Sequence, residues 1–546
     1  MKTVMRPILK LLVVFLGTLC GQALAADAKA PRPNIVFIMA DDIGWGDFQC
    51  YNPQGKVPTP HIDRLARKGM RFTDAHTPAA LCAPTRYAVA TGNYTWRGRH
   101  PGGTWGWNQK PQFLPGQKTV GHLLQAAGYR TGLFGKLHFG GEFEPGPEGR
   151  PDFTKPMKTG PTQWGFDYSY VLLGGHQGPP YMFFENNRVA GDAAKVTQLE
   201  AGPLNGGTVP VSGPGLPDWD SRQVGQTLVA KTLAFIDQSK DQPFYIHLST
   251  DGAHVPFTPP ETLLGTPVAG VTEMTPKTDM AYEVDVVVGK LVEALEKRGL
   301  IENTLIVVTS DNGGVPAERG RGHDAVGGLH GAKSQIWEGG HRVPFVVQWK
   351  GHVPADTVRH QVIGTHDIVP TFVALAGGTF EPNQMLDSVS LAPVLLGQRG
   401  DDQPVRHTLL IQSSPGRDAL AEGERQVAHH KVWDEIAKKG ATSGSDGMAH
   451  ALREGPWKLV FDIEHDHPAA IYNLADDLAE QKNLIEDPAQ TDRIQRMEKL
   501  YREIRASKRS VPVVEAPATP PQKIGWFPTH RGRSSSISLR PHGFGR

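Results

Sequence analysis

Short apolar runs alternate along the chain with segments in which apolar residues recur every three to four positions. The runs with the length and β-branched content of buried strands lie at residues 34–39, 244–248, 305–308 and 343–349. The segments with helical spacing lie at residues 59–68, 119–127, 224–238 and 280–297, and several of them end at a glycine. Continuous apolar strands separated by helices predict an α/β domain with a large, mostly parallel sheet flanked by helices.

Two parts of the chain depart from this alternation. Residues 139–220 are rich in glycine, proline and polar groups, so we expect long loops there, at the carboxyl edge of the sheet. From about residue 400, short strands at 408–412 and 457–461 and a polar helix at 490–507 predict a second, smaller sheet-and-helix unit. The expected organisation is a main α/β domain over 26–400, a C-terminal α+β subdomain over 401–508, and a Pro/Ser/Arg-rich tail over 509–546.

The N-terminus has the pattern of a secretory signal peptide over residues 1–25. Three basic residues within the first ten precede an apolar run at 11–19, which is too short to span a bilayer. Ala23-Leu24-Ala25 supplies small residues for cleavage before Ala26. A lipoprotein reading of Cys20 is weaker, because the bulky Leu19 precedes it. We therefore expect a protein that is exported, either periplasmic or secreted, and no other apolar run is long enough for a membrane span.

Composition and charge narrow the function classes. Hydrophobic residues make up 39% of the 546 residues and charged residues 21%, which is typical of a globular protein with more than one core. The net charge of +1 gives no electrostatic reason to expect binding to nucleic acid or to an anionic membrane. Removal of the signal leaves only Cys50 and Cys82, and a disulfide between them remains open at this point.

Polar residues cluster directly after two of the predicted strands. Asp41-Asp42 follow the first strand, and Asp311-Asn312 follow the strand at 305–308. In open α/β sheets, ligands bind outside the carboxyl ends of the strands. Each pair alone is also a common turn sequence, but together they offer four hard oxygen donors. Such a set suits Ca²⁺, or Mg²⁺, better than zinc, which prefers nitrogen and sulfur ligands.

Cationic residues follow other predicted strands. Lys136 and His138 come after the short apolar run at 131–134, and His254 comes after the strand at 244–248. Lys333 lies in a polar loop before Trp337. Each of these taken alone is more often a solvated lysine or a hydrogen-bonded structural histidine than a site residue. They become candidates for an anion-binding pocket only if they converge on the acidic residues at the same edge of the sheet.

Cys82 lies in the segment AALCAPTRYAVATGNY, at the predicted start of a short helix. Pro84 suits the first turn of a helix and Gly92 suits its end, while Arg86 lies one turn inside. The N-terminus of a helix favours an anion, so Cys82 fits a structural thiol, a thiolate nucleophile or a residue modified after synthesis. A thiolate phosphatase would need an arginine at position 88, which is alanine, so that reading fails.

These motifs together resemble the sulfatase family of the alkaline phosphatase superfamily, over most of the chain from about residue 34 to the last helix. The matching motifs, in the family's order, are Asp41-Asp42, Cys82-Ala83-Pro84-Thr85-Arg86 with Thr91-Gly92, Lys136-x-His138, His254-x-Pro256, Ser310-Asp311-Asn312-Gly313, and Lys333 followed by Glu338-Gly339-Gly340-His341-Arg342-Val343-Pro344. Thr85 stands where serine is commoner. The resemblance implies an alkaline phosphatase-like fold, an arylsulfatase-type activity on sulfuric esters, and oxidation of Cys82 to formylglycine (3-oxoalanine) by a separate maturation enzyme.

The family's roles carry over by motif. Asp41, Asp42, Asp311 and Asn312 would bind Ca²⁺, with the modified residue 82 completing the coordination. The hydrated aldehyde would attack sulfur, and its second hydroxyl would then lose a proton so that sulfate leaves. The remaining roles are stabilisation of the diol by Arg86, its deprotonation with help from His138, protonation of the leaving oxygen by His254, and contacts to sulfate from Lys136 and Lys333. This much positive charge suits the charge that develops on the sulfuryl oxygens.

The resemblance leaves the substrate open. A sulfated carbohydrate or small aryl sulfate is expected, with a phosphate or phosphonate monoester hydrolase of the same superfamily as the alternative. A carbohydrate-binding protein with a dead site is the alternative of another class. The loops at 100–118 and 160–220 carry aromatic residues that suit either sugar stacking or loop packing, namely Trp105, Trp107, Trp164, His176 and Tyr181.

Overall fold

The computed structural model describes residues 32–203, 210–413 and 449–512. The predicted signal peptide at 1–25 and the tail from residue 513 lie outside the described residues, so both stay predictions. Within the described part, no helix is both long enough and apolar enough to cross a membrane.

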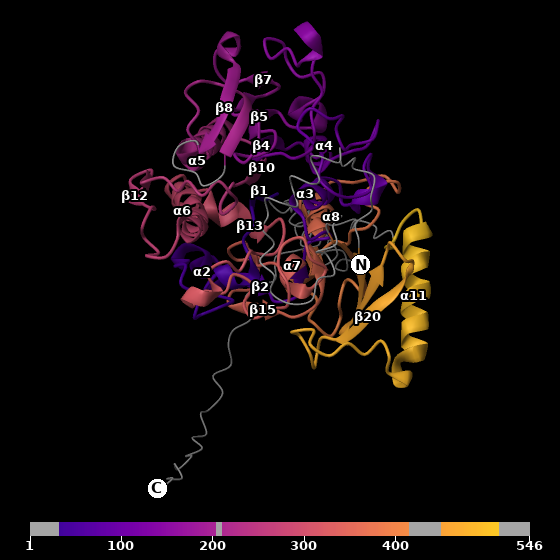
Figure 1. Cartoon of the computed structure of the whole chain (residues 1–546). Helices are drawn as coiled ribbons and strands as arrows, with labels where there is room; N and C mark the ends of the chain where they lie inside the picture. The colour runs from indigo at the N-terminus through magenta and orange to yellow at the C-terminus, as the bar shows by residue number, and fades with distance from the viewer. Residues whose placement is uncertain (1–31, 204–209, 414–448, 513–546) are drawn as a thin grey trace, which may run out of the picture. The chain divides into compact units, whose positions relative to one another are not determined.

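A ten-stranded sheet forms the centre of the main domain (Figure 1). Its five middle strands run parallel in the order β13 (Thr304–Ser310), β1 (Asn34–Ala40), β10 (Phe244–Ser249), β4 (Arg130–Lys136) and β5 (Tyr168–Leu172). The sheet continues beyond β13 through β14 (Phe345–Gln348), β2 (Met70–Phe72) and β15 (Thr357–Arg359), and beyond β5 through β6 (Phe184–Glu185) and β7 (Arg188–Val189). The predicted α/β class is confirmed.

Most strand pairs of the sheet are parallel, as expected, and its outer part adds antiparallel pairs. β14 pairs antiparallel with both β13 and β2, and β6 pairs antiparallel with β5 and β7. The sheet is therefore mixed, with a parallel centre. The short turn between β6 and β7 makes a hairpin, and a hairpin joins only antiparallel strands.

Helices cover both faces of the sheet, which explains why its central strands are continuously apolar. Along β1, Ile35 and Phe37 pack into one core with α3 (Cys82–Thr91), α4 (Val120–Ala126) and α8 (Ile368–Leu375). Val36 and Ile38 pack on the other face with α2 (Pro60–Arg67), α5 (Val224–Ser239) and α6 (Pro276–Lys297). Successive residues of a strand point to opposite faces, so both sets must be apolar. The four helices expected in the main domain are present, with ends shifted by a few residues.

The region 139–220, expected to be loops, contains regular structure as well. β5, β6 and β7 belong to the main sheet, and β8 (Thr197–Pro203) pairs with β9 (Pro210–Gly215) in a separate hairpin. Two further short pairs join β3 (Ala75–His76) to β16 (Ile363–Gly364) and β11 (Thr262–Leu263) to β12 (Thr266–Pro267). Strands of two residues carry no detectable period, so the sequence pattern missed them.

The C-terminal unit is a four-stranded antiparallel sheet with a helix against it. Its strands are β17 (Thr408–Gln412), β18 (Ala449–Glu454), β19 (Trp457–Asp462) and β20 (His467–Asn473), and α11 (Thr491–Ala506) buries Met497, Tyr501 and Ile504 in their core. The smaller α+β subdomain is thus present, while its boundary at residue 400 stays a prediction. Two short helices, α7 (Glu338–His341) and α9 (Ala392–Leu395), belong to the part before it.

Candidate active site

The polar residues predicted after the strands meet at one edge of the sheet. Asp41 and Asp42 follow β1, Asp311 follows β13, and Lys136 is the last residue of β4. β1 pairs in parallel with β13 and β10, and β10 pairs in parallel with β4. Their carboxyl ends therefore lie side by side, as the topology of a parallel sheet requires.

Cys82 begins helix α3 and lies buried against this edge. Its Sγ is 3.3 Å from Nδ1 of His138. Burial raises the pKa of the Cys82 thiol, although Lys136 and Lys333 act in the opposite direction. A thiolate nucleophile needs a depressed pKa, so this environment disfavours the thiolate reading. Neither Cys82 nor the half-buried Cys50 forms a disulfide, which rules out the Cys50–Cys82 bridge left open by the sequence.

Arg86 lies one turn after Cys82, where its side chain is buried and contacts the acidic residues. Its Nε and Nη2 donate to Oδ2 of Asp311 at 3.0 and 2.6 Å, and its Nη1 donates to the carbonyl of Lys136 at 3.1 Å. A fork of this kind fixes the guanidinium plane as well as its charge. Arg86 therefore joins α3 to the ends of β13 and β4.

The two lysines each pair with one aspartate of the Asp41-Asp42 turn. Lys136 Nζ lies 2.5 Å from Oδ2 of Asp41, and Lys333 Nζ lies 2.5 Å from Oδ1 of Asp42. Burial alone would raise the pKa of Asp41, but Lys136, His254 and Arg86 outweigh it and hold that pKa well below its usual range. Both aspartates are thus ionised inside a buried site.

The donor set fits a hard divalent cation. Oδ1 of Asp41 and Oδ1 of Asn312 are buried and have no hydrogen-bond partner among the described residues. Nδ2 of Asn312 donates to Asp42 at 2.8 Å, so the amide oxygen is the free end of that side chain. Burial and the charge of Asp41 raise the pKa of Asp311 to about 7, which reflects carboxylates crowded together without enough positive charge. Orphaned oxygens of this kind are the ligands that Ca²⁺ and Mg²⁺ take.

Two of these side chains stand on a left-handed backbone. Asp42 has φ of 62° and His138 has φ of 57°, although neither is glycine. Non-glycine residues in this region cost free energy and cluster at functional sites, where the surrounding structure holds them. In this backbone conformation the Asp42 side chain points toward Lys333 and Asn312, and the His138 side chain points toward Cys82.

His254 lies on the loop after β10, with one ring nitrogen directed to the acidic residues. Its Nε2 is 3.7 Å from Oδ2 of Asp42, while its Nδ1 donates to the carbonyl of Val255 at 2.8 Å. Burial, helped by Lys333, lowers the pKa of His254 to about 3. The imidazole is therefore neutral in the free site, with the lone pair of Nε2 facing the pocket.

Sequence reasoning did not single out Asp251, and it named His176 only among the aromatic residues that suit sugar stacking or loop packing. Asp251 lies two residues after the end of β10, and its Oδ1 accepts the backbone N–H of His176 at 3.2 Å. The signal was present, because Asp251 is another acidic residue just beyond a buried strand. The aromatic candidates do not form an exposed surface on which a sugar could stack. Four of them are buried, namely Trp105, Trp164, His176 and Tyr181, and Trp107 packs on Phe143 and Phe153. Loop packing accounts for them.

A second cluster of candidate ligands lies outside this edge. His76, Glu338 and His341 place ligand atoms within 4.8 Å of one another. Nζ of Lys458 already lies 3.1 Å from both Glu338 and His341, so a cation fills the place that a metal would take. Lys458 belongs to β19, and this network therefore joins the C-terminal sheet to α7.

Comparison with known proteins gives one consistent result. The family model described as Sulfatase matches residues 33–378, which is more than half of the chain. An N-acetylgalactosamine-6-O-sulfatase of Bacteroides thetaiotaomicron is 30% identical over 89% of this chain and 96% of its own, and human arylsulfatase A is 35% identical over 83% and 85%. A solved structure from work on glycosaminoglycan metabolism by Bacteroides thetaiotaomicron has a TM-score of 0.71 at 25% identity, covering 87% of this chain and all of that one. The protein accordingly belongs to the sulfatase family and is a sulfuric ester hydrolase.

Proposed function

We propose that this chain is an exported sulfatase that removes sulfate from a sulfated carbohydrate, and from aryl sulfates, through formylglycine made from Cys82. The observation that carries the proposal is the position of Cys82, buried at the start of α3 and facing His138. A buried thiol with a raised pKa is a poor nucleophile. A hydrated formylglycine at this position supplies a hydroxyl nucleophile that can be regenerated after each turnover.

The cationic residues around position 82 hold the sulfate group in this proposal. Lys136 and Lys333 each contact one aspartate in the free site, and their ammonium groups can turn to sulfuryl oxygens when substrate enters. Arg86 stays fixed by Asp311 and orients the nucleophile. Fixed positive charge of this kind stabilises the charge that develops on the sulfuryl oxygens.

Asp41, Asp42, Asp311 and Asn312 would hold Ca²⁺, or Mg²⁺, which supplies Lewis-acid neutralisation of a sulfate oxygen. The support is the pair of orphaned oxygens and the crowded carboxylates described above. His138 lies within reach of position 82 and can accept a proton there. Burial, together with Lys136, holds the pKa of His138 well below its usual range, so its imidazole is neutral beside position 82.

A sulfated carbohydrate is proposed because one relative named above is, by its name, an N-acetylgalactosamine-6-O-sulfatase, and aryl sulfates are proposed because another is named an arylsulfatase. The test compares kcat/KM for a panel of sulfated mono- and disaccharides, an aryl sulfate, an aryl phosphate and an aryl phosphonate. We expect sulfate esters to be hydrolysed fastest. Faster turnover of the phosphate or phosphonate would favour the alternative hydrolase of the same superfamily, and no turnover at all would favour a carbohydrate-binding protein.

The metal ligands give a separate prediction. Asp311→Ala should remove bound Ca²⁺ and lower kcat by about 10²–10³, because a charged ligand and the partner of Arg86 are lost together. Metal analysis of the purified protein and kcat on an aryl sulfate are the measurements. Asp237→Ala, which removes an exposed carboxylate paired with Arg298, is the matched control. Stoichiometric zinc without Ca²⁺ or Mg²⁺ in the wild type would contradict the assignment.

His254 is proposed as the acid that protonates the leaving oxygen; because its imidazole is neutral without substrate, Nε2 must first take up a proton, which the negative charge of a bound sulfate ester favours. A sugar alcohol is a poor leaving group and needs this proton, whereas a nitrophenol leaves readily as an anion. His254→Ala should therefore lower kcat/KM for a sugar sulfate by about 10²–10⁴ and affect an activated aryl sulfate much less. Lys333→Ala, which loses a sulfate contact, should lower both similarly. Equal losses on both substrates for His254→Ala would mean that His254 positions sulfate instead.

A further inference from the structure

We propose that His176, held by Asp251, is the positioning residue that fixes His254 for proton transfer to the leaving oxygen. The inference rests on the role proposed for His254 and adds a second histidine that does not touch the substrate. His176 lies before the first hairpin of the region 139–220, far from His254 in the sequence, and only the fold brings the two together.

The contacts fix the backbone of His254 at both of its polar groups. Nε2 of His176 lies 3.0 Å from the carbonyl oxygen of His254, and because a carbonyl only accepts, Nε2 carries the hydrogen. The backbone N–H of His254 donates to the carbonyl of Asp251 at 2.9 Å. Asp251 in turn accepts the backbone N–H of His176 at 3.2 Å. The three residues thus close a ring of hydrogen bonds around the residue that would supply the proton.

The other side of the same loop is tied to the metal-binding turn. The N–H of Ala253 donates to the carbonyl of Asp41 at 2.6 Å, and the N–H of Asp41 donates to the carbonyl of Gly252 at 3.0 Å. His254 therefore sits between two anchors, the Asp41 backbone and the His176 ring. Loss of the His176 anchor removes the restraint on the carbonyl of His254.

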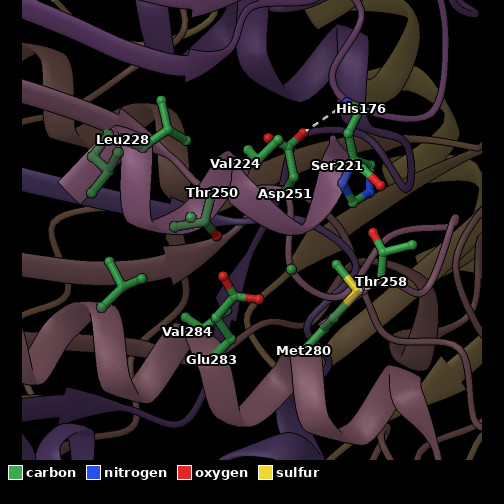
Figure 2. Close-up of a pocket in the computed structure, with 14 residues that line it drawn as sticks. His176, Ser221, Val224, Leu228, Thr250, Asp251, Thr258, Met280, Glu283 and Val284 are labelled. Atoms are coloured by element: carbon green, nitrogen blue, oxygen red, sulfur yellow. Dashed lines mark hydrogen bonds between the residues drawn. The ribbon is translucent and has the colours of Figure 1, made fainter. Parts of the chain in front are cut away.

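A cavity beside the loop makes this hydrogen bond important. Figure 2 shows His176 and Asp251 across the cavity from Met280 and Glu283 of α6. The cavity has a volume of about 20 Å³, which is room for a water molecule and far too little for a sugar. Three side-chain oxygens of residues that line the cavity are buried and have no hydrogen-bond partner among the described residues, namely Ser221 Oγ, Thr250 Oγ1 and Asp251 Oδ2. Gly252 packs closely on Met280 of α6 beside the cavity, and the His176 hydrogen bond adds a restraint at the His254 carbonyl.

The small size of the cavity also limits what the His176 side chain can contact. Its side chain is buried and lines this small space, so it cannot stack on a sugar as the sequence allowed. Because Nδ1 of His254 is held by the carbonyl of the next residue, a shift of the His254 backbone moves Nε2 with it. A displacement of about 1 Å from productive geometry can cost about 10² in rate. His176 thus acts through the placement of His254.

The experiment compares His176→Leu with His176→Gln in the full-length mature enzyme. The glutamine amide can donate to the same carbonyl, whereas leucine fills similar space without a donor. We expect His176→Leu to lower kcat/KM for a sugar sulfate by about 10- to 100-fold and for a nitrophenyl sulfate by less than about threefold. His176→Gln should restore most of the loss. In the His254→Ala background, His176→Leu should add no further substrate-selective loss.

The outcomes separate this inference from the proposed function. If His254→Ala shows no selectivity between the two substrates, the acid role fails and the inference falls with it. If His254→Ala is selective but His176→Leu lowers both substrates equally, or His176→Gln is as impaired as His176→Leu, only the inference is overturned. Should His176→Leu not fold, His176→Met, which also lacks a donor, takes its place in both comparisons.

Discussion

Replacing Cys82 by serine should abolish multiple turnover, with a fall in kcat of at least about 10⁴. A serine hydroxyl beside His138 can still attack sulfur, but it has no second hydroxyl whose proton can be removed to expel sulfate. The protein should therefore accept at most one sulfuryl group and gain about 80 Da. Intact-mass spectrometry after incubation with an aryl sulfate, together with a steady-state assay, measures both effects.

The wild-type protein and a second cysteine variant are the controls. In active wild-type protein, residue 82 should be lighter than an unmodified cysteine by about 18 Da, as oxidation of the thiol to an aldehyde requires. Cys50→Ser changes the other cysteine, which is half-buried near Asp63, and should retain activity. Full turnover by Cys82→Ser, or full activity of wild type with an unmodified thiol, would remove the formylglycine mechanism.

The centre of the fold could be predicted from the sequence because the constraint there is local. β1, β10 and β13 are buried on both faces, so most of their residues are apolar and the strands stand out as apolar runs. The acidic residues that follow β1 and β13 were identified for the same reason. They end an apolar run abruptly, and the edge of a parallel sheet is the place where such residues gather.

What escaped prediction depends on contacts between distant segments. His176 and Asp251 lie 75 residues apart, and the hydrogen bond between them exists only after the loop folds over the sheet edge. The antiparallel strand β14 has the same apolar pattern as a parallel strand, so its direction could not be read from its residues. The sugar-stacking alternative for Trp105 and Trp164 failed because an aromatic side chain suits a loop core as well as a binding surface.

Lys458 is the clearest example of a residue whose role depends on contacts between distant segments, because nothing in the sequence of its strand marks it as important. Its Nζ lies 3.1 Å from Glu338 and 2.7 Å from Glu480, and all three side chains are buried. Burial would raise the pKa of Glu338, but Lys458, His76 and Arg453 outweigh it and keep Glu338 ionised. Glu480 also accepts the backbone N–H of Glu338 at 2.7 Å. Glu338 of α7 and Glu480 therefore share Lys458 of the C-terminal sheet as a cation, while Arg342 and Arg453 pair with Oε2 of Glu338.

Helix α7 links the Lys458 network to the loop that bears the proposed metal ligands Asp311 and Asn312. The N–H of Gly313 donates to the carbonyl of Gly340 at 2.8 Å. A Cβ at Gly313 would lie 1.9 Å from the carbonyl oxygen of Gly339, so the two backbones touch and only glycine fits. Gly313 directly follows Asn312. A movement of α7 must therefore displace the loop that bears Asp311 and Asn312.

Lys458→Met should accordingly lower the apparent free energy of unfolding by about 3–5 kcal/mol, because two buried carboxylates lose the cation that they share. The double variant Lys458→Met/Glu480→Gln should recover part of this loss, since one uncompensated charge is removed with its partner. Lys499→Met, at an exposed lysine 3.9 Å from Glu503, is the matched control and should change stability by less than about 1 kcal/mol. Urea unfolding of the three variants measures the effect, and Ca²⁺ affinity of Lys458→Met measured below its unfolding transition reports on α7. A Lys458→Met protein as stable as the control would show that the buried network does not bear on the fold, and unchanged Ca²⁺ affinity would show that α7 does not transmit it to the metal loop.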